Sequence, residues 1–435
     1  MKLWVCLEGR LAAHLEESGQ RISFDYQESW LGAAGSYPLS QSLPLRPGPL
    51  TGAPVRNFLW GLLPDNERTL DVWARQFHVS ARNPVALLAH VGEDCAGSVQ
   101  FVLEESVDEV LASGNKPAEI EWLSDADLER RIRHLSRDAG AGRESAAEGQ
   151  FSLSGAQAKT ALYFDRRRKR WGIPQGRTPT THILKPASGD FDGFAENEHF
   201  CLALAARIGL AAASTEWVSI GGVPTLIAER YDRIQVDGRW HRIHQEDCCQ
   251  ALGVHPGSKY ESDGGPGFAR IMSLLEGTDE PAVDRERLMR TACLIYLLAA
   301  TDAHAKNFSL LYSRGALRPS MRLAPVYDMA SAWPYPRRIP PQKMKLAMQI
   351  GRHYWSREIQ PRHFEELARA CRYPADALIA TLLDLSERLP DESAALLHEI
   401  ETRGMERTVL AKLRDGLLAQ CHAARRLIKG ASRST

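Results

Sequence analysis

The stretch Thr301-Asp302-Ala303-His304-Ala305-Lys306-Asn307, followed by Val326-Tyr327-Asp328-Met329, decides the fold that we expect of this chain. Asp302 and Asn307 are separated by four residues, and Asp328 follows after a gap of hairpin length. This spacing predicts a phosphoryl-transfer site, in which Asp302 receives or orients the acceptor hydroxyl while Asn307 and Asp328 hold Mg²⁺ against the nucleotide phosphates. Mg²⁺ prefers few protein oxygens beside phosphate and water, and one amide with one carboxylate meets that preference.

The residues around this loop indicate a rigid support for it. The apolar run 294–300 predicts a buried helix that ends where the loop begins. A β-hairpin formed by 308–312 and 321–327 then returns the chain to Asp328. His304 has two interpretations: a neutral imidazole that hydrogen-bonds the loop backbone, or a phosphate contact.

The composition sets broad limits on the function. With 435 residues and 44% hydrophobic content, the chain is long enough for two or three domains. Lys plus Arg equals Asp plus Glu at 54 each, so no overall charge indicates nucleic acid or membrane binding. The eight cysteines are scattered without a Cys-x-x-Cys pair, which favours reduced core thiols. The N-terminus lacks a signal-peptide pattern and no apolar run spans a bilayer, so we expect a soluble, cytoplasmic protein.

The order of motifs predicts four regions. We expect an N-terminal α+β subdomain over 1–110, then a helical connector with a polar small-residue segment over 111–150. Residues 151–235 then form the glycine-loop and β-sheet part of an ATP-binding lobe, and 236–435 form a helical lobe with the catalytic and metal loops. The strands expected in the first two sheet-forming regions are 3–7, 11–16, 21–26, 98–103, 161–165, 181–186, 217–220 and 224–229. The main helices expected are 56–63, 66–77, 84–90, 125–135, 196–208, 377–389 and 409–428, and 333–349 is expected to be irregular.

Three segments of the predicted ATP-binding lobe carry candidate nucleotide contacts. Small residues in Ser154-Gly155-Ala156-Gln157-Ala158-Lys159 would let backbone N–H groups approach phosphate oxygens, although a plain hairpin turn is the alternative. Lys185 ends a strand after this loop and would contact the α- and β-phosphates, with Glu198 as its ion-pair partner; the alternative is a solvated strand end. Glu229-Arg230-Tyr231 occupies the hinge position, where the backbone would bind adenine. The basic run 165–170 favours a solvated hairpin tip over a nucleic-acid contact.

In this order the motifs resemble the HipA family of bacterial serine/threonine kinases, the toxins of HipA–HipB toxin–antitoxin modules. The resemblance covers essentially the whole chain. The matching strings are Leu62-Leu63-Pro64-Asp65, Gly155-Ala156-Gln157-Ala158-Lys159-Thr160, Thr181-His182-Ile183-Leu184-Lys185, Gln245-Glu246-Asp247, Lys259-Tyr260-Glu261-Ser262-Asp263-Gly264-Gly265-Pro266-Gly267 and Asp302-Ala303-His304-Ala305-Lys306-Asn307-Phe308.

The resemblance implies an α+β, two-lobed protein-kinase-like fold of the HipA type, with a mixed α/β N-terminal lobe and an all-helical C-terminal lobe that bind ATP and Mg²⁺. It implies Asp302 as the catalytic base, Asn307 and Asp328 as metal ligands, and Ser152 as an autophosphorylation site that switches the kinase off. The implied ATP-binding residues are Ser154, Gly155, Ala156, Gln157, Ala158, Lys159, Lys185, Glu229, Arg230, Tyr231, His304, Ala305, Lys306, Asn307, Tyr327 and Asp328. Two departures from the family pattern are Ala158, where an acidic residue is usual, and Ser154, a competing acceptor.

The resemblance also implies partners. These are a HipB-like helix-turn-helix antitoxin, operator DNA reached mainly through that antitoxin, and an aminoacyl-tRNA synthetase as substrate. Glutamyl-tRNA synthetase is the main candidate for that substrate. The implied outcome is halted translation, growth arrest and persistence, with the protein also serving as a corepressor. Two other hypotheses remain: a catalytically weak corepressor or binding module, and a lipid or small-molecule kinase, because Asp-x-His-x-x-Asn is also typical of phosphoinositide kinases.

Overall fold

The computed structural model describes residues 1–112, 119–137, 152–153, 155, 157–175, 178–187, 191–314, 319–401, 405 and 407–431. The chain divides into two compact units. Unit 1 comprises residues 1–189, 219–257 and 309–321, and unit 2 comprises 190–218, 258–308 and 322–435. The four regions expected from the sequence remain a prediction.

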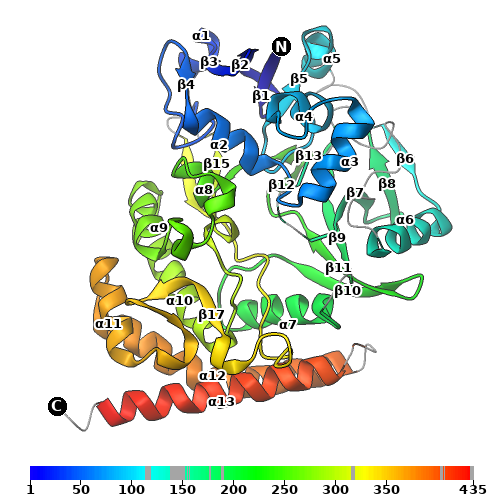
Figure 1. Ribbon diagram of the computed structural model, residues 1–435. Helices are drawn as coiled ribbons and strands as arrows, with labels where there is room; N and C mark the ends of the chain where they lie inside the picture. The colour runs from blue at the N-terminus through cyan, green and yellow to red at the C-terminus, as the bar shows by residue number, and fades with distance from the viewer. Residues whose placement is uncertain are drawn as a thin grey trace. The chain divides into compact units, whose positions relative to one another are not determined.

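Unit 1 begins with a five-stranded sheet in the order β4-β3-β2-β1-β5 (Figure 1). Its strands are β1 (Lys2–Leu7), β2 (Arg10–Ser18), β3 (Arg21–Tyr26), β4 (Leu50–Thr51) and β5 (Gln100–Val102). Buried and partly exposed residues alternate along β3, as expected of a strand with one face on a core. Leu3, Leu15 and Phe24 lie in that core, and the predicted strands 3–7, 11–16 and 21–26 are confirmed.

Three helices follow in unit 1, each with a local reason for its start. They are α2 (Ala53–Leu62), α3 (Glu67–Phe77) and α4 (Pro84–Val91). The Asn66 side chain caps α3 by accepting from two backbone N–H groups, and Asn83 caps α4 ahead of Pro84. All three predicted helices are therefore confirmed. The short helices α1 (Glu28–Leu31), α5 (Val107–Ala112) and α8 (Cys248–Ala251) also belong to this unit.

A second, six-stranded sheet has the order β10-β11-β9-β7-β8-β6. The strands are β6 (Ile120–Trp122), β7 (Thr160–Asp165), β8 (Arg170–Pro174), β9 (His182–Pro186), β10 (Thr215–Ile220) and β11 (Val223–Glu229). Helix α6 (Asp125–Arg137) contacts β9 and β11. The basic run 165–170 joins β7 to β8 as a turn, with most of its side chains exposed, as predicted.

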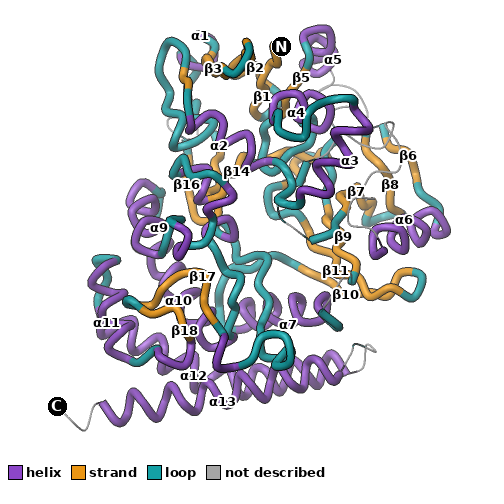
Figure 2. Tube along the Cα trace, in the orientation of Figure 1, coloured by secondary structure: helices purple, strands orange, loops and turns teal. Residues whose placement is uncertain are grey.

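Two smaller sheets lie between residues 233 and 323 (Figure 2). Strands β12 (Arg233–Val236) and β13 (Arg239–Arg242) form a hairpin. Strand β14 (His244–Asp247) pairs with β15 (Ser309–Ser313), which is followed in the sheet by β16 (Ser320–Leu323). The predicted hairpin after the catalytic loop is thus present, although its second strand ends at Leu323 instead of continuing to residue 327.

Unit 2 is mostly helical. Its helices are α7 (Phe194–Arg207), α9 (Phe268–Leu274), α10 (Pro281–Leu298), α11 (Pro361–Ala370), α12 (Ala375–Glu401) and α13 (Arg407–Ala431). Helices α12 and α13 lie side by side and both contact α7 (Figure 1). One expectation is wrong here: the end of 333–349 is not irregular, because β17 (Lys345–Ile350) pairs with β18 (His353–Trp355).

Candidate active site

The catalytic loop starts where α10 ends. Leu294–Leu298 are all buried, and Ala299 ends the helix in the left-handed conformation with φ 48°. The loop closes through the N–H of His304, which donates to the Asp302 carbonyl at 2.8 Å, and leads into a turn of 3₁₀ helix over Ala305–Asn307. The predicted rigid support of the loop is therefore present, and it positions Asp302 with an exposed side chain.

Asn307 connects the two carboxylate-bearing residues. Its Nδ2 donates to the carbonyl oxygens of Asp302 at 3.0 Å and of Asp328 at 3.2 Å. These two bonds use both amide hydrogens and thereby identify the nitrogen end of the amide, so Oδ1 is left as an acceptor. An amide oxygen beside the Asp328 carboxylate provides the hard oxygen ligands that Mg²⁺ prefers. The residues present therefore fit the predicted metal.

The Asp328 segment is fixed by the carbonyl groups that α10 leaves unpaired at its C-terminus. Ser331 Oγ donates to the Leu298 carbonyl at 2.6 Å, and Trp333 Nε1 donates to that of Leu297 at 3.2 Å. Asn197 of α7 then holds the Ser331 backbone through both its amide oxygen and its amide nitrogen. Asp328 itself has φ 53°, a conformation that non-glycine residues seldom adopt, and these anchors support it.

His304 lies against the same site in a neutral form. It is 5% exposed, and burial lowers the pKa of its imidazole, an effect that nearby Asp302 partly offsets. Its Nδ1 is buried without a hydrogen-bond partner among the described residues, so this nitrogen makes no bond to the loop backbone. The phosphate contact stays a prediction.

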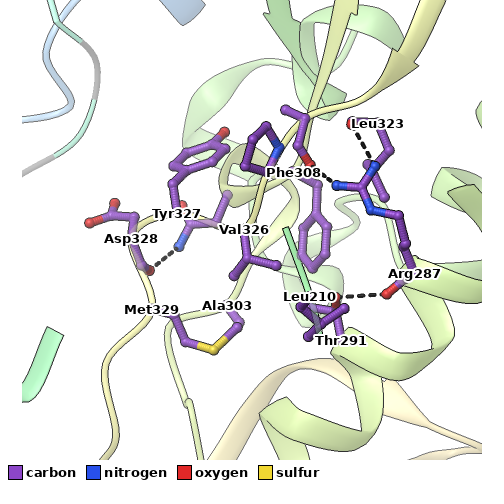
Figure 3. Close-up of a pocket in the computed structure, with 13 residues that line it drawn as sticks. Leu210, Arg287, Thr291, Ala303, Phe308, Leu323, Val326, Tyr327, Asp328 and Met329 are labelled. Carbon is purple, nitrogen blue, oxygen red and sulfur yellow. Dashed lines mark hydrogen bonds between the residues drawn. The ribbon is translucent and has the colours of Figure 1, made fainter. Parts of the chain in front are cut away.

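An apolar pocket lies next to the predicted metal ligands Asn307 and Asp328 (Figure 3). It encloses about 430 Å³ of empty space, part of it open to solvent, and Asn307 and Asp328 lie on its wall. In Figure 3 the Asp328 carboxylate points away from the other labelled side chains. The remaining lining residues are Leu210, Arg287, Thr291, Ala303, Phe308, Leu323, Ala324, Pro325, Val326, Tyr327 and Met329.

Arg287 holds the loop that forms one side of this pocket. Its guanidinium donates to the carbonyl groups of Leu323 at 3.0 Å and Ala324 at 3.1 Å (Figure 3). It also pairs with Asp284 on the same helix. Asp284 in turn accepts from the Leu323 N–H at 3.0 Å. The chain before Asp328 is therefore fixed to α10 at two successive residues.

The glycine loop belongs to unit 1, and Ser154 and Ala156 lie outside the described residues. Gly155 has φ 101°, and a Cβ added there would lie 2.7 Å from Lys159 Nζ. Glycine thus allows the ammonium group to approach the loop backbone, which is the type of cradle that suits a phosphate. Gln157 and Ala158 lie between them, and Ala158 is buried.

Ser152 is fully buried beside this loop. Its Oγ donates to the Leu62 carbonyl at 2.8 Å, and its N–H donates to the Asp94 carbonyl at 3.0 Å. Gly155 forms a further bridge to Pro64, next to Asp65, whose N–H donates to the Gly155 carbonyl. The predicted phosphorylation site is therefore inaccessible in this conformation.

The remaining predicted nucleotide contacts have different surroundings. Lys185 is buried at the end of β9 in unit 1, and Glu198 is buried in α7 of unit 2; their pairing stays a prediction. The Arg230 N–H already donates to the Thr181 carbonyl, and its side chain is buried among carboxylates. In the Glu229-Arg230-Tyr231 segment, Arg230 therefore serves the interior of the unit, and its N–H is not available to adenine.

Two of these carboxylates and three arginines form a cluster that we call the arginine cluster: Asp94, Arg230, Asp232, Arg233 and Arg242. Asp94 contacts all three arginines at 2.9–3.5 Å, and Asp232 contacts Arg230 and Arg233 at 2.8 and 3.0 Å. Burial alone would raise the pKa of Asp94, but the three guanidinium groups hold it well below its ordinary value. The sequence prediction missed this cluster, and the run Arg230-Tyr231-Asp232-Arg233 was its only local signal.

The sequence prediction also missed the residues that hold the catalytic residues in place. Tyr260 donates its hydroxyl to Asp302 Oδ1 at 2.5 Å, and Tyr327, expected at the nucleotide, donates its hydroxyl to the Lys306 carbonyl at 2.6 Å. Tyr260 lies within a string that the family resemblance had already singled out, which was the available signal. Asn197 and Ser331 had no such signal, since each is a common polar residue in an unremarkable context.

Two structural features are absent from the described part of the chain. Over the residues that the structure describes, no cluster of three or more His, Cys, Asp or Glu side chains is arranged to hold a metal ion. Of the two predicted metal ligands, Asn307 and Asp328, only Asp328 belongs to these residue types. Within the same described ranges, no helix has both the length and the apolarity needed to cross a bilayer.

Comparison with known proteins gives a consistent result. Residues 3–102 match the HipA N-terminal domain, and residues 151–393 match the HipA-like C-terminal domain. A Sinorhizobium fredii protein named "Putative kinase Y4mE" is 39% identical over 352 residues, covering 80% of each chain. The Shewanella oneidensis serine/threonine-protein kinase toxin HipA is 26% identical over 420 residues, covering 93% of this chain and 91% of the relative.

The fold agrees with these matches. The structure of Shewanella oneidensis HipA, in a complex with HipB and its operator DNA, superposes with a TM-score of 0.81 at 24% identity and covers 98% of each chain. This likeness confirms the predicted α+β kinase-like fold of the HipA type. The chain belongs to the HipA family of serine/threonine protein kinases.

Proposed function

We propose that this protein is an ATP- and Mg²⁺-dependent kinase toxin that transfers phosphate to a serine or threonine hydroxyl, with Asp302 as its base. The observation that carries the proposal is the Asn307 amide, which binds the backbone of both Asp302 and Asp328 and so holds the two carboxylates in a fixed relation. The match to a relative named a kinase toxin supports the same conclusion.

The residues of this chain would divide the work in a simple way. The exposed Asp302 carboxylate accepts the proton of the acceptor hydroxyl, which makes that oxygen a better nucleophile. Asn307 Oδ1 and the Asp328 carboxylate hold Mg²⁺, which when bound offsets the negative charge of the phosphates. Lys159 and Lys185 supply positive charge to those phosphates, and neutral His304 supplies a polar contact beside them.

The other proposed ATP contacts are weaker in their support. Ser154 to Lys159 would cover the phosphates, Glu229 and Tyr231 would bind adenine, and Ala305, Lys306 and Tyr327 would line the site. Among these, the Lys159 approach to Gly155 is the feature that best fits a phosphate. Arg230 has the least support, because its N–H and its guanidinium are both engaged elsewhere.

Autophosphorylation at Ser152 would switch the kinase off. Because Ser152 Oγ is buried and bonded to the Leu62 carbonyl, the segment must leave this position before it can be phosphorylated. A phosphate dianion cannot return to a buried site that offers a carbonyl oxygen as its neighbour. Modification would therefore keep the glycine loop away from the nucleotide.

The proposed partners follow from the relatives. The similar HipA of Shewanella oneidensis forms a complex with HipB and operator DNA, which supports a HipB-like antitoxin here and a corepressor role on DNA. We propose an aminoacyl-tRNA synthetase as substrate, with glutamyl-tRNA synthetase the first to examine. Its phosphorylation would halt translation and lead to growth arrest and persistence.

Phosphosite mass spectrometry on cells expressing the wild type or Asp302→Asn tests these proposals together. We expect a synthetase serine and Ser152 to be phosphorylated only with the wild type. Tyr373→Phe, in the same unit as Asp302, is the control and should give the wild-type pattern. If the wild type phosphorylates no protein, the corepressor alternative replaces the kinase toxin; if it phosphorylates purified lipid alone, the lipid-kinase alternative does.

A further inference from the structure

We propose that Tyr260 is a positioning residue for the base Asp302, an inference that rests on the proposed function. The Tyr260 hydroxyl donates to Asp302 Oδ1 at 2.5 Å, the short distance typical of an O–H bond to a charged carboxylate. Because Oδ1 already accepts this bond, we assign Oδ2 as the oxygen that accepts the proton of the acceptor hydroxyl. Tyr260 thus selects the reactive oxygen and fixes the carboxylate's rotation.

The backbone around Tyr260 is held firmly enough for this role. The Tyr260 carbonyl accepts from the N–H groups of Asp263 at 3.0 Å and Gly265 at 2.9 Å. Its ring meets the His304 ring edge-on, with centroids 5.2 Å apart. The preceding Lys259 carbonyl accepts from the Ala305 N–H at 3.4 Å, so the segment binds the catalytic loop at three places: a hydroxyl, a ring and a carbonyl.

Glu261 connects the same segment to β17. Its carboxylate accepts from the Gln349 N–H at 2.7 Å, and burial raises its pKa. A Cβ on Gly267 would lie 2.1 Å from Glu261 Oε1, and one on Gly265 would lie 2.2 Å from the Ser258 carbonyl oxygen. These two glycines therefore permit a close packing that larger residues would prevent, which gives the family string Lys259–Gly267 a structural reason.

Removing the hydroxyl should affect turnover rather than nucleotide binding. In Tyr260→Phe the ring and its His304 contact remain, but Asp302 loses a hydrogen bond to a charged group. We expect kcat for ATP consumption by the full chain with Mg²⁺ to fall about 10- to 100-fold, because such bonds contribute about 1.5–3 kcal/mol. The KM for ATP should stay within about two-fold of the wild type, since an altered kcat alone marks an interaction made in the transition state.

A double-mutant cycle separates positioning from a general structural role. With Asp302→Asn in place, Tyr260→Phe should cause no further loss of the residual rate, because the carboxylate through which it acts is absent. The matched control Tyr373→Phe also removes a hydroxyl from a partly buried tyrosine of unit 2 and should leave kcat unchanged. Thermal midpoints of all variants should agree with the wild type within a few degrees.

The outcomes distinguish this inference from the proposed function. Wild-type kcat in Tyr260→Phe, together with an inactive Asp302→Asn, would overturn the role of Tyr260 and leave Asp302 as the base. An equal loss from Tyr260→Phe in both backgrounds would also overturn it, since the tyrosine would then act independently of Asp302. Full activity of Asp302→Asn would instead remove the base itself, and the proposed mechanism with it.

Discussion

The catalytic region of unit 2 and the arginine cluster of unit 1 both contain two aspartates, but the burial and the partners of these aspartates differ. Asp94 and Asp232 are buried and surrounded by guanidinium groups, each held at 2.8–3.5 Å. Asp302 is exposed and its carboxylate accepts from a neutral phenol, while Asp328 is fixed mainly through its backbone. Charge pairing makes the first two structural, whereas the proposed base Asp302 accepts its hydrogen bond from an uncharged group.

The comparison also shows how each region reaches its fixed geometry. The arginine cluster joins three segments of unit 1 through side chains: Arg233 alone binds the carbonyl groups of Gly97 and Thr180 as well as Asp94. The segment after Asp328 is held by neutral hydrogen bonds to backbone carbonyls at the end of α10, and the charged Arg287 holds the chain before Asp328. None of these bonds uses the carboxylate of Asp302 or Asp328, whereas in the arginine cluster the carboxylates themselves form the ion pairs.

The largest expected effect is the loss of phosphotransfer when Asp302 is replaced. Asp302→Asn keeps the shape of the side chain but removes the base, so phosphotransfer should fall by a factor of about 10² to 10⁴. The thermal midpoint should stay close to that of the wild type, because no ion pair is lost. The rate of ATP consumption and a melting curve, measured on the same preparation, check the expected loss of activity and the expected unchanged midpoint. A strongly lowered midpoint would mean that Asp302 is structural like Asp94.

At Asp94 we expect a loss of stability instead of a loss of activity. Asp94→Asn leaves three buried guanidinium groups with one carboxylate, and the free energy of unfolding should fall by about 3–5 kcal/mol. Since the pKa of Asp94 is lowered by folding, its contribution is present at neutral pH and is lost as the pH falls below the ordinary carboxyl range. Denaturant unfolding at pH 7 measures the loss. The control Asp71→Asn removes an exposed carboxylate on α3 of the same unit and should leave the curve unchanged, so equal curves for both variants would contradict the prediction.

Glu246 sharpens the comparison, because it is buried with hydrogen bonds instead of guanidinium partners. Burial raises its pKa from 4.5 to about 7, and bonds from Tyr312 and the Gln41 N–H offset this only in part. The folded protein therefore binds a proton that the unfolded chain releases, and stability should fall by about 3 kcal/mol as the pH rises from 4.5 to 7.

Glu246→Gln should remove this part of the pH dependence. Unfolding free energies of wild type and variant, measured at several pH values across that interval, give the difference directly. Glu121→Gln, an exposed carboxylate on β6, should keep the wild-type dependence. Parallel curves for wild type and Glu246→Gln would show that a buried carboxylate needs no cation to remain ionised here.

The smallest expected effect concerns a neutral group. Ser152→Ala deletes the bond from Oγ to the Leu62 carbonyl, and the free energy of unfolding should fall by about 1 kcal/mol. The control Ser136→Ala removes a hydroxyl whose bond to the Arg133 carbonyl is exposed, so its effect should be smaller. Denaturant unfolding resolves the two, and an unchanged stability of Ser152→Ala would show that the buried bond does not hold the glycine loop.

Much of the fold could be predicted because its causes are local. Alternation along β3, the asparagine caps of α3 and α4, and the apolar end of α10 are each encoded within a few neighbouring residues. The error at β17 has a physical reason as well: a proline-rich approach hid a short strand whose partner, β18, follows only after a turn.

In the candidate site, too, local features could be predicted and long-range contacts could not. The sequence by itself determined the spacing of Asp302, Asn307 and Asp328, because one short loop and one hairpin connect them. Only the tertiary structure decided that Tyr260 binds Asp302, that Asn197 anchors Ser331, and that Arg230 turns inward to Asp94 and Asp232. The pairs Tyr260–Asp302, Asn197–Ser331 and Arg230–Asp94 lie 42, 134 and 136 residues apart, so packing and not local sequence brings each pair together.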